Sequence, residues 1–121
     1  MYSARLLDHF QNPRNVGELP PPAVTVEVSN PVCGDILRLS VEFRDGRVAQ
    51  ACYKTRGCTA SIAAGSALTE LLAGKTAVEI ASLGPGDVED AVGGLSPESK
   101  HAAMLAVDAV RALLSSREAA G

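Results

Sequence analysis

Between residues 24 and 55 the chain alternates apolar and polar positions, which is the pattern of strands that bury one face. We expect two such strands over residues 24–28 and 37–43. A third strand, over residues 48–55, follows Asp45-Gly46, a dipeptide that favours a two-residue hairpin turn. The alternation therefore predicts antiparallel strands, the last two of them joined as a tight hairpin.

On either side of this region the apolar residues recur with helical spacing. Ser3 can cap a first helix, which Asn12-Pro13 ends, and after Gly57 the helical spacing begins again. The expected helices cover residues 3–11, 59–73, 76–83 and 87–92, with a last helix that starts near Ser96 and frays from Ser115. The expected inner face of the last helix consists of Met104, Leu105, Ala109, Val110 and Leu113. Strands followed by helices predict an α+β fold, a single domain over residues 1–121 whose three-stranded antiparallel sheet is covered by helices.

The composition does not point to a nucleic-acid or membrane partner. The 121 residues carry a formal net charge of −3, and the Lys and Arg residues are scattered rather than gathered into a basic face. No apolar run reaches the ~20 residues that span a bilayer. The start of the chain lacks the features of a secretory signal, so we expect a cytoplasmic protein.

The chain has three cysteines, and an odd number cannot all pair within one molecule. Disulfides are rare in the reducing cytoplasm. Metal binding or thiol chemistry is therefore the more informative interpretation of these residues.

Cys33 and Cys58 are far apart in the sequence, but the expected hairpin brings them together. Counted outward from a two-residue turn, Cys33 pairs with Cys58 at the open end of the hairpin. Asp35 follows two positions after Cys33 and adds a carboxylate, and Cys58 begins a helix, where the dipole favours a thiolate. Two thiolates and a carboxylate make an incomplete tetrahedral set that needs a fourth partner. The alternatives are two ordinary small residues that face each other, or a regulatory disulfide, which the expected compartment disfavours.

The third cysteine and the two histidines carry weaker signals. With a two-residue turn, Cys52 shares a sheet face with Leu39 and is expected to be a buried core thiol, whereas a longer turn would expose it. His9 lies in the first helix as a surface or packing residue. His101 lies early in the last helix, where a lone histidine is more often structural than a ligand.

Several short motifs follow one another along the chain. They are Asn12-Pro13-Arg14-Asn15-Val16-Gly17, Asn30-Pro31-Val32-Cys33-Gly34-Asp35, Lys54-Thr55-Arg56-Gly57-Cys58-Thr59-Ala60-Ser61-Ile62-Ala63 and, after His101, Leu105-Ala106-Val107-Asp108-Ala109-Val110. In order and approximate spacing they resemble the IscU/NifU-type family of iron–sulfur cluster scaffolds. The resemblance covers nearly the whole chain, and the two cysteine motifs are specific only when taken together.

The resemblance implies an α+β fold and a ligand set at one end of the molecule. Carried over by position, the ligands are Cys33, Asp35, Cys58 and His101. The family's third cysteine directly follows the histidine, and here that position is Ala102. The remaining Cys–Asp–Cys–His set is adequate for zinc and compatible with a labile [2Fe–2S] centre, because Cys/His ligation of such clusters has precedent.

The resemblance therefore implies a scaffold that holds a labile iron–sulfur cluster and passes it on. Its partners would be a cysteine desulfurase and acceptor proteins, and a homodimer is left open. One alternative is a zinc-binding regulatory or interaction protein descended from such a scaffold. Another is a sulfurtransferase that carries a persulfide on Cys58 or Cys33. The sequence has no nucleophile elbow, phosphate-binding loop or dinucleotide fingerprint, so we do not expect an enzyme with a substrate pocket.

Overall fold

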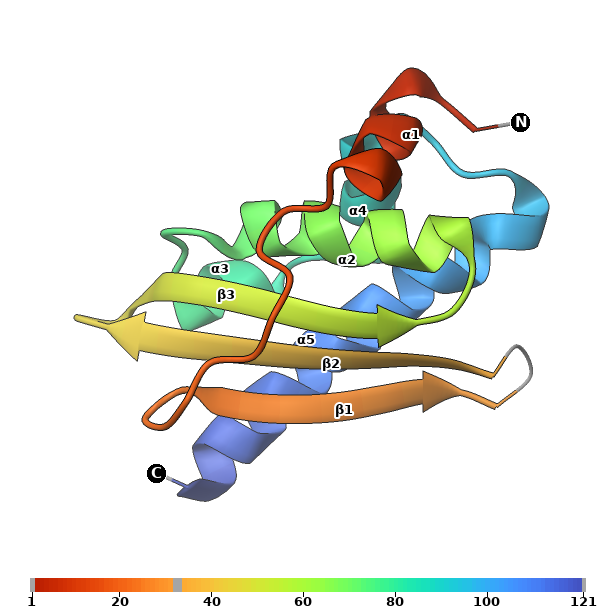
Figure 1. Cartoon of the computed structure of the whole chain (residues 1–121). Coiled ribbons are helices and arrows are strands. Elements are labelled where there is room, and N and C mark those ends of the chain that lie inside the picture. The colour runs from red at the N-terminus through yellow and green to blue at the C-terminus, as the bar shows by residue number, and fades with distance from the viewer. Residues whose placement is uncertain (1, 32–33, 121) are drawn as a thin grey trace.

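The computed structural model describes residues 2–31 and 34–120, and the expected α+β fold is confirmed. An antiparallel sheet of three strands is built in the order β1-β2-β3 (Figure 1). The strands are β1 (Val24–Asn30), β2 (Asp35–Arg44) and β3 (Arg47–Arg56). The helical elements are α1 (Ala4–Gln11), α2 (Thr59–Leu72), α3 (Ala77–Ala81), α4 (Pro85–Ala91), the 3-10 turn η1 (Pro97–Ser99) and α5 (Lys100–Ala120).

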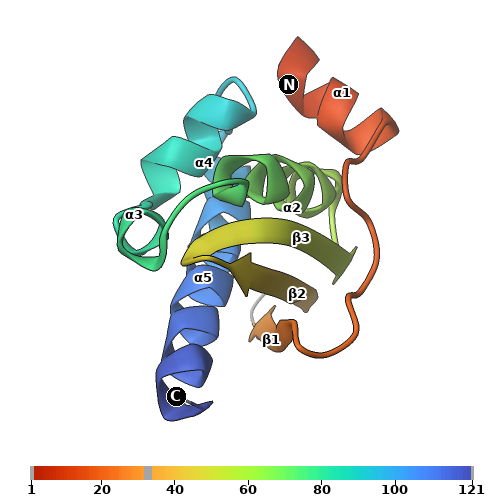
Figure 2. The same cartoon turned by 90° about the vertical axis from the view of Figure 1, so that its left-hand side faces the viewer.

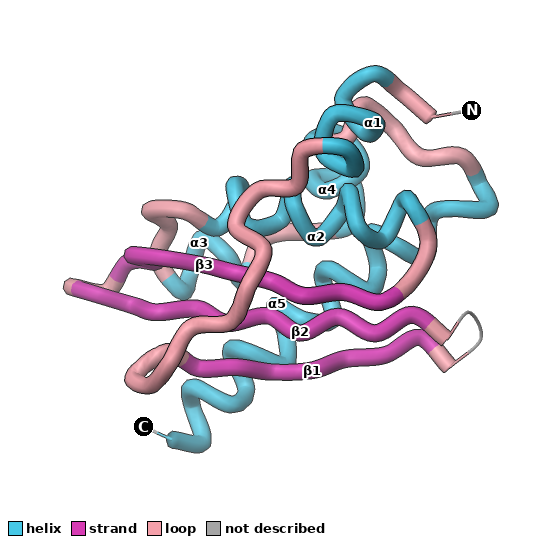
Figure 3. The backbone as a smooth tube through the Cα atoms, in the orientation of Figure 1, coloured by secondary structure: helices cyan, strands magenta, loops and turns pink. Residues whose placement is uncertain are grey.

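The sheet has helices on one face and an extended segment on the other. Helices α2 and α5 cover the same face, with α2 over β3 and α5 against β1 (Figure 2). The segment between α1 and β1 first lies along the edge of β3, where the backbone N–H of Gly17 donates to the carbonyl of Tyr53 at 2.8 Å. It then crosses the opposite face of the sheet to reach β1 (Figure 3). The sheet therefore lies between a helical layer and a partial cover of irregular chain.

The predicted two-residue turn between β2 and β3 is confirmed. Asp45 and Gly46 both have positive φ, at 55° and 77°, as a type I′ turn requires, and Arg44 pairs with Arg47. The register then shifts next to Glu42, because Phe43 pairs with Val48 while Glu42 pairs with Gln50. Ala49 is thus an extra residue on β3, a β-bulge.

The bulge makes the prediction for Cys52 wrong. An extra residue turns every later side chain of the strand to the other face. Cys52 consequently pairs with Ser40 on the face away from the helices and is half-buried there, and burial raises the pKa of its thiol. Ala51 and Tyr53 lie in the core instead.

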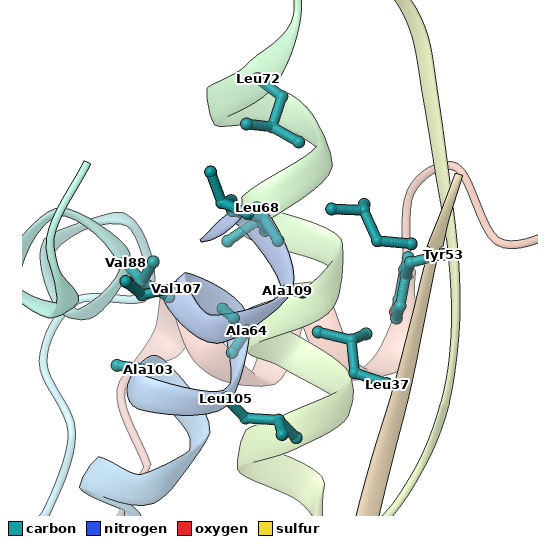
Figure 4. Close-up of a cluster of buried hydrophobic side chains, with 14 of the residues drawn as sticks. Leu37, Tyr53, Ala64, Leu68, Leu72, Val88, Ala103, Leu105, Val107 and Ala109 are labelled. Carbon is teal, nitrogen blue, oxygen red and sulfur yellow. The ribbon is translucent and has the colours of Figure 1, made fainter. Parts of the chain in front are cut away.

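The core lies between the sheet and the helices (Figure 4). Leu37, Leu39 and Val41 of β2 point into it, and many of the facing residues on α2 and α5 are alanines, which let these helices approach closely. The ring of Tyr53 packs where Gly65 of α2 has no side chain, because a Cβ there would lie 2.5 Å from the ring.

Two expectations for the last helix are wrong. Met104 is 42% exposed, whereas Leu105, Ala109, Val110 and Leu113 are buried as predicted. The helix does not fray from Ser115 but continues to Ala120.

None of the helices within residues 2–31 and 34–120 combines the length and the apolar character that a membrane span requires.

Candidate metal centre

Three of the predicted ligands meet at the open end of the β2–β3 hairpin. Asp35 is the first residue of β2, Cys58 is the N-cap of α2, and His101 lies in the first turn of α5. The Sγ of Cys58 lies 3.8 Å from Oδ2 of Asp35 and 3.7 Å from Nε2 of His101. The same two atoms of Asp35 and His101 are 3.2 Å apart. One ligand atom from each residue thus lies within 4.8 Å of the others.

Asp35 is a buried carboxylate, only 4% exposed. A buried carboxylate is costly unless it is hydrogen-bonded or paired, and the hydroxyl of Ser61 donates to its Oδ2 at 2.5 Å. Gly57 makes room for it on another side, because a Cβ at Gly57 would lie 2.6 Å from Cγ of Asp35. The bulge in β3 has a direct effect here, because the shifted register pairs Ile36 with Arg56, and Asp35 and Gly57 are the next residues outward.

The ring of His101 is oriented by η1, the 3-10 turn directly before its helix. Its Nδ1 lies 3.0 Å from the backbone carbonyl of Glu98, to which an Nδ1–H donates. This bond leaves Nε2 without a proton in the neutral ring, facing Asp35 and Cys58. Metal-binding histidines are commonly held in this way by a carbonyl on the other nitrogen.

Cys58 caps α2 without using its side chain. The structure gives no side-chain capping hydrogen bond at this N-cap, so Sγ is free to face the other two residues. The cysteine as a whole is half-buried.

Thiolate, imidazole and carboxylate together are a donor set suited to zinc or iron. Three such groups leave further coordination positions open. The predicted fourth ligand, Cys33, lies outside the described residues, so its membership stays a prediction. Ala102, where the resemblance implies a cysteine, is 2% exposed and offers no donor atom.

Sequence reasoning missed Ser61 and Gly57. Ser61 stands three residues after Cys58, and this i, i+3 spacing puts both on one side of the first turn of a helix. The spacing was a usable signal for Ser61. The requirement for glycine at position 57 depends on the register beyond the bulge, for which the sequence offered no signal.

Comparison with known proteins agrees with this architecture. The model of the family described as NifU-like N terminal domain matches residues 1–119. The iron–sulfur cluster assembly scaffold protein IscU 1 of Archaeoglobus fulgidus is 41% identical over 92% of this chain and 72% of its own length. IscU of Buchnera aphidicola subsp. Baizongia pistaciae is 34% identical over 93% of this chain and 92% of its own.

Solved structures share the fold. A proposed scaffold protein for the SUF system from Fervidobacterium islandicum superposes with a TM-score of 0.74 at 20% identity, over 93% of this chain and 96% of that one. The N-terminal part of a NifU-like protein from Brucella abortus gives 0.63 at 24% identity, over 91% and 77%. The chain belongs to the NifU-like N-terminal domain family.

Proposed function

We propose that this protein is a scaffold on which iron and sulfide are assembled into a cluster, which then passes to acceptor proteins. The observation that carries the proposal is the meeting of Asp35, Cys58 and His101 at the ends of three separate elements. The names of its relatives support the same function, since IscU 1 of Archaeoglobus fulgidus is an iron–sulfur cluster assembly scaffold.

In this proposal the cluster is cargo rather than a resident cofactor. The side chain of His101 is 23% exposed and Cys58 is half-buried, so part of the ligand set can be reached from solvent, although Asp35 is buried. A ligand set that solvent and a partner can reach suits a cluster that must be loaded and released. Cys33 would supply a second thiolate, which makes a Cys–Asp–Cys–His set for a [2Fe–2S] cargo.

The donor of sulfur would be a cysteine desulfurase, and the receivers would be iron–sulfur proteins. The chain itself would hold the cargo and catalyse no separate reaction. A cytoplasmic location belongs to the same proposal, because thiol ligands stay reduced there. A pair of chains around one cluster would supply additional ligands, and the number of chains per cluster is part of the test.

The test is anaerobic reconstitution with iron and sulfide, followed by iron, zinc and acid-labile sulfide analysis and absorption spectroscopy. We expect near-stoichiometric iron and sulfide in the wild type, with loss of the cluster absorption in Cys58→Ala, His101→Ala and Cys33→Ala. Gel filtration of the loaded protein reports the number of chains per cluster. Stoichiometric zinc that resists replacement, with no sulfide, would refute the scaffold function and favour a zinc-binding regulatory protein.

A further inference from the structure

Ser61 is buried beside two of the three candidate ligands, although a serine is not one of the residue types expected to bind the metal here. It is 3% exposed, and its Oγ lies 2.5 Å from Oδ2 of Asp35 and 3.4 Å from Sγ of Cys58. A serine hydroxyl has one proton, and an ionised carboxylate can only accept. The hydroxyl therefore donates to Asp35, and the short distance is that of a charge-assisted hydrogen bond.

The oxygen that accepts this bond is the one that faces the other ligands. Oδ2 of Asp35 also lies 3.2 Å from Nε2 of His101 and 3.8 Å from Sγ of Cys58. Gly57 lies against another side of the same carboxylate and offers space without a donor side chain. Of the two side chains that donate to Oδ2, the Ser61 hydroxyl makes the shorter bond, at 2.5 Å against 3.8 Å from Sγ of Cys58, and Ser61 is not itself a candidate ligand.

We infer that Ser61 is a positioning residue, whose hydroxyl holds the Asp35 carboxylate in the orientation that binds a metal. The inference rests on the proposed function, because it concerns the same site. The bond joins α2 to β2, because Ser61 lies in the first turn of α2 and Asp35 is the first residue of β2. Outer-shell partners of this kind typically contribute about 10–100-fold to metal affinity.

Helix α2 provides a matched control in Ser66. This serine is also fully buried, and its Oγ lies 2.8 Å from Nδ1 of His9 and accepts the backbone N–H of Arg14 at 2.9 Å. It contacts no candidate ligand in these bonds. Ser66→Ala therefore removes a buried serine from the same helix without touching the orientation of Asp35.

The experiment is titration of the metal-free protein with Co²⁺ alone, followed by its visible absorption. We expect Ser61→Ala to weaken Co²⁺ binding about 10–100-fold and to change the shape of the ligand-field bands, because the carboxylate is no longer held. Ser61→Thr, which keeps a hydroxyl, should restore the wild-type bands. Ser66→Ala should leave both affinity and spectrum unchanged. Thermal unfolding of each metal-free variant separates loss of the fold from loss of the site.

Equal affinity and identical bands in wild type and folded Ser61→Ala would overturn the inference, as would an equal loss in Ser66→Ala. The outcome for the proposed function is read separately, from iron–sulfide reconstitution of the wild type. Co²⁺ binding that depends on Ser61, with no cluster formed, would refute the scaffold function and support the positioning role. A cluster formed by the wild type, with Co²⁺ binding insensitive to Ser61→Ala, would support the scaffold function and refute the positioning role.

Discussion

Helix α2 carries two buried serines that belong to two clusters with the same kinds of residues. At its start, Ser61 contacts the carboxylate of Asp35, which lies beside His101. One and a half turns further on, Ser66 contacts His9, whose Nε2 lies 3.6 Å from the carboxylate of Glu70. We call the first the site cluster and the second, which also includes Arg14, the junction cluster, because it joins α1 to α2.

The two clusters differ in the burial of the acid and in the charge beside it. In the junction cluster, the Glu70 side chain is 53% exposed, and the guanidinium of Arg14 lies 4.0 Å away. In the site cluster, Asp35 is buried, and across residues 2–31 and 34–120 it forms no ion pair with a Lys or Arg. The junction cluster pairs its carboxylate with a guanidinium, whereas the site cluster places a buried carboxylate beside the Cys58 sulfur and the His101 ring. Among the described residues, the site cluster is the one whose three ligand atoms lie close enough together to hold a metal ion.

The largest change in metal affinity at the site cluster should come from Gly57→Ala. The added Cβ would lie 2.6 Å from Cγ of Asp35, so the carboxylate must move. We expect metal affinity to fall about tenfold or more, and overpacking to cost about 1–3 kcal/mol of stability. Co²⁺ titration and chemical denaturation measure the two effects.

Gly86→Ala is the matched control for that substitution. Gly86 lies in the first turn of α4, and an added Cβ there meets no atom within 4 Å. We expect wild-type metal affinity and no loss of stability. A folded Gly57→Ala protein with the metal affinity of Gly86→Ala would contradict the role assigned to the space beside Asp35.

A smaller effect, on stability and not on the site cluster, is expected from Ser3→Ala. The Ser3 hydroxyl caps α1 by accepting the N–H of Leu6 at 3.0 Å and donates to the carbonyl of Val92. Loss of such a cap costs about 1 kcal/mol, within a range of roughly 0.5–2. We expect this destabilisation in urea denaturation, with metal affinity unchanged, and none in Ser115→Ala, which alters an exposed residue of α5. A tenfold change of metal affinity in Ser3→Ala would mean that the start of α1 is coupled to the site cluster.

The smallest expected effect is a difference between the wild type and His9→Gln in how stability depends on pH. Burial lowers the pKa of His9, and the neighbouring Arg14 lowers it further, against the opposing influence of Glu70 and Asp8. The unfolded chain therefore binds a proton at His9 more readily than the folded one. Above the unfolded pKa of about 6.5, His9 is neutral in both states and does not lower the stability of the fold. As the pH falls below that value, protonation of His9 favours the unfolded chain, so the free energy of unfolding decreases.

We expect the Tm of the metal-free protein to fall on acidification from pH 7.5 to 5.5, and to fall less in His9→Gln. Glutamine keeps a hydrogen-bonding group near Ser66 but cannot titrate. Thermal unfolding followed by circular dichroism at several pH values measures both slopes. Identical slopes would show that the titration of His9 does not affect the stability of the fold.

Much of the fold could be predicted because it follows from short-range interactions. The cap at Ser3 and the turn at Asp45-Gly46 each depend on a few neighbouring residues, and both lie where they were expected. The placement of Cys58 at the start of α2 is of the same kind. His101 was different, because its own helical pattern favoured a structural role and only the family resemblance made it a candidate.

Other features depended on which distant residues became neighbours. The bulge at Ala49 moved Cys52 to the other face of the sheet, and no local pattern signalled it. The burial of His9 arises because α1 packs on α2, and the bond between Ser61 and Asp35 arises because a helix start meets a strand start. Local propensities are properties of a few adjacent residues, which is why the elements and most of the ligand types could be predicted. Burial, register and the direction of Asp35 are set by contacts between segments far apart in the chain, which no local pattern specifies.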